Sequence, residues 1–179
     1  VQSGAIDEAT IDAASLNVLR AMDRVGLLNR APRGDLTADV STPSHRDIAR
    51  RVAAHAIVLL KNDNILPLHT CAGLVVLGDL DNYTVGGGSG RVVGRTVSLA
   101  DAFETRCGIV EAYADLQSKK AQDAVATAAN VLVVTGSQST EGADRSTLAL
   151  DGEAMIEAAA KLNHHVIVAC AAPGAFLTG

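Results

Sequence analysis

The sequence has 179 residues, a length that suits one domain or one domain with part of another. Hydrophobic residues make up 48% of it but aromatic residues only 2%, so a core must be built mainly from Ala, Val, Leu and Ile. A formal net charge of −5 without any basic run argues against nucleic acid as a partner, and no apolar run approaches the ~20 residues of a membrane-spanning helix.

Two helices are predicted in the first third of the chain. Residues 6–25 carry apolar side chains at intervals of three and four, which is typical of an amphipathic helix. The polar segment 30–43 is predicted to be a linker or surface loop. A second helix is predicted to begin at Ser44, because Asp47 follows at the spacing of an N-terminal capping motif. Its buried stripe is expected to consist of Ile48, Val52, Ala56 and Leu59.

From residue 70 onward, short aliphatic runs alternate with helical stretches. Strands are predicted at 74–77, 109–113, 131–135 and 166–170, and helices at 98–106, 119–129 and 151–162. The aliphatic runs are continuous, which indicates strands buried on both faces. The alternation predicts an α/β fold, a mostly parallel sheet with helices on both faces. Ligands bind at the C-terminal ends of such strands, where the loops 78–94 and 136–150 leave the sheet.

The three cysteines, Cys71, Cys107 and Cys170, lie far apart in the sequence. None of them is part of a Cys-x-x-Cys pair or has a histidine at zinc-binding spacing. We therefore expect buried free thiols, and the cellular compartment is left open.

The first of the two loops contains a run of glycines, Gly86-Gly87-Gly88-Ser89-Gly90. Consecutive glycines let a ligand approach the backbone closely. The run does not match the glycine spacing of dinucleotide-binding folds, and it lacks the Gly-Lys-Ser/Thr of a phosphate-binding loop. Two interpretations stay open: a flexible surface loop, or a ligand-facing loop in which Gly88 and Ser89 contact a polar substrate.

The second loop contains Glu141-Gly142-Ala143-Asp144-Arg145, directly after a predicted buried strand. A carboxyl group at the edge of the sheet can serve as a general acid if burial keeps it protonated near neutral pH. Asp144 and Arg145 are expected to support the loop as a charged brace. The alternative is an ordinary solvated acidic turn in which Glu141 pairs with Arg145. We expect Ser89 and Glu141 to lie at the same edge of the sheet and to face one shared cleft.

These segments together resemble glycoside hydrolase family 3. The stretch 56–62 (AIVLLKN) with 66–68 (LPL) is similar to the family's VLLKN…LPL segment, which leads from a (β/α)8 barrel into an α/β sandwich domain. Residues 86–90 resemble its GGGSG loop, and residues 141–150 resemble its EGxDRxxLxLP signature. The helix at 6–25 is similar to the last barrel helix. The motifs occur in the family's order over nearly the whole chain.

The resemblance implies a retaining hydrolase of β-linked glucosides or related sugars, without a metal or organic cofactor. By this resemblance, Glu141 is the expected catalytic acid/base, and Ser89 and Gly88 are expected to contact the substrate. The expected domains are a barrel remnant (1–30), a linker with a connecting helix (31–69) and a truncated α/β sandwich domain (70–179). The expected partners are a carbohydrate substrate and the missing barrel, with neither nucleic acid nor membrane.

The chain departs from the family pattern at several points. Asp151 stands where the signature has Pro, and Ala172-Pro173-Gly174 differs from the family's Gly-Ala-Pro. No Asp matches the motif of the nucleophile, which lies in the barrel, so this chain alone is expected to be inactive. Two rival interpretations remain: a non-catalytic α/β carbohydrate-binding or interaction module, and a flavodoxin-like nucleotide-binding domain, against which the missing phosphate motifs count.

Overall fold

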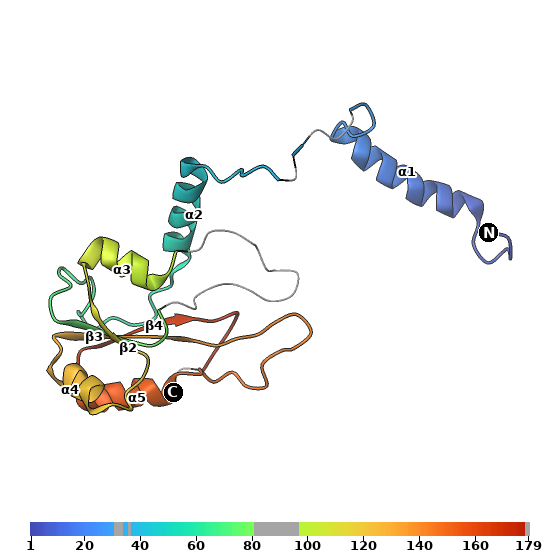
Figure 1. The fold of residues 1–179 in the computed structure, drawn as a ribbon. Helices are drawn as coiled ribbons and strands as arrows, with labels where there is room; N and C mark the ends of the chain where they lie inside the picture. Colours follow the sequence, from blue (N-terminus) through green and yellow to red (C-terminus); the bar gives the residue numbers. More distant parts are fainter. Residues whose placement is uncertain (31–33, 36, 81–96, 178–179) are drawn as a thin grey trace. The chain divides into compact units, whose positions relative to one another are not determined.

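The computed structural model describes residues 1–30, 34–35, 37–80 and 97–177 (Figure 1). Gly88 and Ser89, the predicted substrate contacts, therefore lie outside the described residues. The chain divides into two compact units, Val1–Val58 and Leu59–Gly179, and each is considered by itself. Among the described residues, no helix combines the length and the apolar character needed to cross a membrane.

The first unit contains two helices, α1 (Glu8–Arg24) and α2 (Pro43–Ala56). α2 begins one residue before the predicted start, and its cap is Thr42, whose hydroxyl accepts the backbone N–H of His45 at 3.2 Å. The capping role expected of Ser44 is therefore wrong, because Pro43 occupies the first helical position, which it favours.

The stripe predicted to be buried on α2 is exposed. Neither α1 nor α2 contains a buried residue, and the side chains of Ile48 and Val52 are 54% and 63% exposed. Leu59 lies beyond the end of α2 and is 64% exposed. An amphipathic face is buried only where another surface packs on it, and periodicity alone does not supply that surface.

The second unit is built on a four-stranded parallel sheet, as predicted. Its strands are β1 (Leu74–Leu77), β2 (Glu111–Tyr113), β3 (Asn130–Gly136) and β4 (Val166–Ala171), in the spatial order β2-β1-β3-β4. β2 begins two residues later than predicted, and Ile109 is 95% exposed instead of lying in the strand.

Helices cover both faces of this sheet (Figure 1): α3 (Leu99–Cys107) lies on one face, and α4 (Lys119–Thr127) and α5 (Glu153–Leu162) lie on the other. Alternate residues of the central strands point to the two faces, as the pleat requires. The larger core cluster faces α4 and α5 and contains Val75, Leu77, Val125, Val131, Val133 and Ala159. The smaller cluster faces α3 and contains Leu74, Val76 and Val134.

Burial on both faces holds for the two central strands only. All four residues of β1 are buried, as is most of β3. No residue of β2 or β4 is buried, and Val168 of β4 is 42% exposed. The prediction of double burial is therefore wrong for β2 and β4, because they are the edge strands and have a neighbour on one side only.

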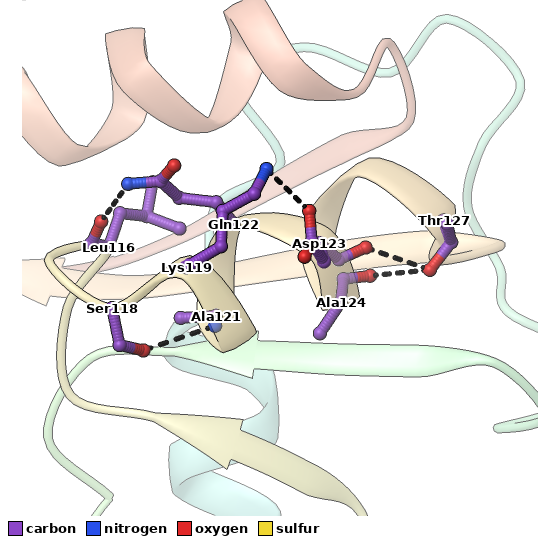
Figure 2. A network of polar contacts seen from close by, with 8 residues as sticks. All are labelled: Leu116, Ser118, Lys119, Ala121, Gln122, Asp123, Ala124 and Thr127. Carbon is purple, nitrogen blue, oxygen red and sulfur yellow. Dashed lines mark hydrogen bonds and ion pairs between the residues drawn. The ribbon is translucent and has the colours of Figure 1, made fainter.

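Side-chain contacts to the backbone define the N-terminal end of α4. The Ser118 hydroxyl accepts the N–H of Ala121 at 3.1 Å, and the Gln122 amide donates to the carbonyl of Leu116 at 2.9 Å (Figure 2). These two contacts fix the first turn of α4 and the residues that precede it.

The C-terminal ends of α4 and α5 are joined by one half-buried side chain. Asn163, which follows α5, donates from Nδ2 to the carbonyl oxygens of Val125 and Ala128 at 2.8 and 2.9 Å. Its Oδ1 accepts the backbone N–H of His165 at 2.8 Å. One residue therefore ties two neighbouring helices to the chain that enters β4.

Two of the cysteines are bonded to each other, contrary to the expectation of three free thiols. Cys71 and Cys107 form a disulfide with their Cα atoms 5.5 Å apart, across 36 residues of sequence. The free cysteine is Cys170 on β4, which is half-buried. Burial raises the pKa of its thiol.

Candidate active site

The strand order creates a switch point between β1 and β3. From β1 the chain passes to β2 on one side, and from β3 it passes to β4 on the other. At such a point the loops leave the two strands in opposite directions, and the crevice that opens at their C-terminal ends is where ligands bind. Leu77, the last residue of β1, pairs with Val133, while β3 continues to Gly136. The two candidate loops therefore leave the sheet from adjacent strands.

The first loop leaves the sheet through Gly78. This residue has φ +116° and donates its N–H to the carbonyl of Tyr113 at 2.9 Å. A Cβ at this position would lie 2.2 Å from the carbonyl oxygen of Val134, so the backbones of β1 and β3 approach here as only glycine permits. The start of the loop is thus placed at the switch point. Its glycine run falls within residues 81–96, outside the described part of the chain.

The second loop starts and ends at the same place. The N–H of Asp151 donates to the carbonyl of Gly136 at 3.1 Å, so the chain returns to the end of β3 before α5 begins. Gly152 then packs on Thr135 so closely that a Cβ would lie 2.0 Å from the Thr135 Oγ1. Residues 137–150 therefore form a compact loop whose ends meet.

Glu141 lies at the tip of a tight turn in this loop. Thr140 and Ala143 are paired by backbone hydrogen bonds of 3.3 and 3.0 Å, with Glu141 and Gly142 between them. Gly142 has φ +77°, which is the value required at the third position of a type II turn. Glu141 is exposed in the described chain. The turn thus leaves Glu141 accessible to solvent at the tip of the loop.

Asp144 and Arg145 hold the loop through different partners. Asp144 accepts a hydrogen bond from the Ser139 hydroxyl at 3.1 Å. Arg145 is half-buried and donates to the Ser137 hydroxyl at 2.8 Å and to the carbonyl of Ala175. The guanidinium therefore connects the start of the loop to the segment that follows β4.

The sequence interpretation missed several supporting residues. Ser137 and Ala175 were not expected to bind Arg145, and the approach of Gly152 to Thr135 was not expected either. The segment after β4 is also fixed to the loop by the N–H of Leu177, which donates to the Leu148 carbonyl at 2.9 Å. Within the described ranges, no three His, Cys, Asp or Glu side chains are grouped so that they could hold a metal ion.

Comparisons with known proteins cover the same part of the chain. Residues 57–178 match the family described as the glycosyl hydrolase family 3 C-terminal domain. Beta-D-xylosidase 3 of Arabidopsis thaliana is 30% identical over 174 residues, covering 86% of this chain and 22% of that protein. A beta-xylosidase of Formosa agariphila is 32% identical over 187 residues, covering 88% and 26%.

Solved structures show the same fold. A beta-glucosidase from Chaetomella raphigera superposes with a TM-score of 0.81 at 24% identity, over 98% of this chain and 30% of that one. A beta-D-glucoside glucohydrolase from Trichoderma reesei gives 0.79 at 25% identity, with the same coverage. The chain thus spans about a quarter of the length of its curated relatives, 22% and 26% of the two named.

Proposed function

The chain belongs to glycoside hydrolase family 3, and we propose that it is the part of a retaining β-glucosidase that supplies the acid/base residue, Glu141. The observation that carries this proposal is the position of Glu141. It lies at the tip of a tight turn, on a loop that starts and ends at the switch point of a parallel sheet. Carboxyl groups presented at that edge are well placed to act on a ligand in the crevice.

In the proposed reaction, two carboxyl groups flank the glycosidic bond about 5–5.5 Å apart. A nucleophile outside this chain attacks the anomeric carbon while Glu141 gives its proton to the departing oxygen. Glu141 then takes a proton from water, which attacks the glycosyl–enzyme intermediate. Ser89 and Gly88 are proposed to contact sugar hydroxyl groups.

The surroundings of Glu141 in the whole enzyme are part of the proposal. A general acid works near neutral pH when water is excluded from it, and Glu141 is exposed in the described chain. We propose that bound sugar and a (β/α)8 barrel domain cover Glu141 and exclude water from it. In this arrangement residues 1–30 are the end of that barrel, residues 31–69 the linker with its connecting helix, and residues 70–179 the α/β sandwich domain.

A β-xyloside is the second candidate substrate. Proteins named as xylosidases from a plant and a bacterium align with 86% and 88% of this chain, whereas a beta-glucosidase of Rhizobium radiobacter aligns with 51%. Glucosides and xylosides differ by one hydroxymethyl group, so the same pair of carboxyl groups serves both. Initial rates on the two aryl glycosides would separate these candidates.

The decisive experiment replaces Glu141 by Gln in the intact protein with its barrel domain. Activity on glycosides with poor leaving groups, such as alkyl glycosides, should fall ~10²–10⁴-fold, because an alkoxide needs the proton that the acid supplies. Activity on nitrophenyl glycosides should fall much less, and azide should partly restore it by attacking the intermediate without help from a base. The 179-residue chain alone should show no useful turnover.

Glu157→Gln is a matched control, since Glu157 lies on α5 in an exposed ion pair with Lys161 at 3.9 Å. It should leave both substrate classes unchanged. Equal losses on both classes in Glu141→Gln, without any effect of azide, would make Glu141 a structural residue. An intact protein that binds sugar but hydrolyses no glycoside would instead favour the interpretation as a carbohydrate-binding module.

A further inference from the structure

α3 is the most thinly packed helix of the second unit. None of its nine residues is buried, whereas α4 and α5 bury Ala121, Val125 and Ala159 completely. Leu99 and Phe103 are the α3 side chains that pack against the smaller core cluster. Isolated helices shorter than about 12–15 residues are marginal in water, so a helix of this length depends on its tertiary attachments.

The two ends of α3 are attached by different means. At the start, the N–H of Leu99 donates to the carbonyl of Leu80 at 3.0 Å. At the end, Cys107 is the last helical residue, and its sulfur is bonded to Cys71. The C-terminal end of α3 is therefore held covalently.

The segment that contains Cys71 is held by backbone hydrogen bonds. The carbonyl of Cys71 accepts the N–H of Leu74, the first residue of β1, at 3.1 Å. Two residues further on, the carbonyl of Gly73 accepts the N–H of Ala129 at 2.9 Å, just before β3. The segment from Cys71 to Gly73 is thus fixed to the starts of both central strands, and the disulfide connects this segment to α3.

We propose that the Cys71–Cys107 disulfide is the clasp that holds α3 on the sheet, and that breaking it releases α3 while the α4–α5 face stays folded. The bond forms by thiol–disulfide exchange: the two thiols give two protons and two electrons to an oxidising disulfide, which leaves as two thiols. A dithiol reductant reverses the reaction. The proposal is independent of the glycosidase function, because the disulfide and the packing of α3 involve no residue to which a catalytic or substrate-binding role is assigned.

The first measurement is the number of reactive thiols in the protein as isolated. Iodoacetamide in denaturant, without reductant, should label Cys170 and leave Cys71 and Cys107 unlabelled; after treatment with dithiothreitol all three should be labelled. Labelling of Cys71 and Cys107 without reductant would overturn the proposal.

The second measurement is amide hydrogen exchange in the intact protein. In the Cys71→Ser/Cys107→Ser variant, the amides of Leu99–Cys107 should exchange at least tenfold faster, while those of α4 and α5 change less than twofold. The melting temperature should fall by about 5–15 °C, as expected for the loss of a native disulfide in a domain of this size. Cys170→Ser is the matched control and should change neither.

If the double variant does not accumulate as folded protein, dithiothreitol added to the native wild type provides the same test. α3 should exchange faster after reduction and return to its former rate after reoxidation. Unchanged amide exchange in α3 after complete reduction would show that noncovalent packing is sufficient to hold the helix, and would refute the proposal.

Discussion

Replacing Gly136 by Ala should destabilise the sheet at the point where the Glu141 loop begins. Gly136 is the last residue of β3 and pairs with Ala171 of β4. An added Cβ would lie 2.1 Å from the carbonyl oxygen of Ala171, and real Cβ contacts essentially never fall below 3.0 Å. The two strands would have to separate by about 0.9 Å, the difference between these distances.

The cost follows from what this separation breaks. The obstructing atom belongs to the backbone, so no change of side-chain rotamer relieves the contact. The same carbonyl accepts the N–H of Ser137 at 3.1 Å. Overpacking of this kind costs about 1–3 kcal/mol, and the loss of a hydrogen bond about 0.5–1.5 kcal/mol. We therefore expect the free energy of unfolding to fall by about 2–4 kcal/mol.

Urea denaturation followed by circular dichroism measures this loss as a lower transition midpoint with an unchanged slope. Gly174→Ala is the matched control, because a Cβ there meets nothing within 4 Å. It should stay within about 0.5 kcal/mol of wild type. A Gly136→Ala variant as stable as the control would refute the close approach of β3 and β4 at this residue.

Two further predictions concern α5 and β4. Asn163→Ala should lower the free energy of unfolding by about 1–3 kcal/mol, because the carbonyls of Val125 and Ala128 lose their donor. Asn163→Asp retains the acceptor for His165 but not the donor, so it should lower the free energy of unfolding at least as much. Urea denaturation at neutral pH measures both losses. Since burial raises the pKa of the Cys170 thiol, its thiolate forms only at higher pH, and alkylation by iodoacetamide should reach half its maximal rate at a higher pH than for an unstructured peptide thiol. A profile that coincides with that of the peptide would contradict the shift.

The strands of the sheet could be predicted from sequence because their signal is local. The run Leu74–Leu77 is a strand over the residues expected. β3 extends one residue further than expected at each end, and β4 one residue further at its C-terminal end. Ile109 is the exception, because an apolar side chain beside a short edge strand need not be covered. The cap of α2 was misassigned because Pro43 is a stronger signal for a helix start than the Ser44–Asp47 spacing.

Features that join distant segments could not be predicted in this way. The strand order and the Cys71–Cys107 bond depend on which segments meet in space, and no spacing rule encodes a pairing across 36 residues. The same applies to Arg145, whose carbonyl partner at Ala175 lies 30 residues further along the chain. The position of the Glu141 loop could be predicted from sequence, because the loop follows a buried strand. The turn that presents Glu141 was indicated only by the neighbouring Gly142.

The return of the Glu141 loop to Gly136 has a consequence for how this site can evolve. Because the N–H of Asp151 closes the loop on the carbonyl of Gly136, the sheet and α5 are joined by that contact whatever lies between them. Doubling the length of such a loop costs only about 0.6 kcal/mol of closure entropy. Insertions and deletions near the tip of this loop, away from Arg145 and Leu148, can therefore reshape the surface around Glu141 while the sheet and α5 keep their register.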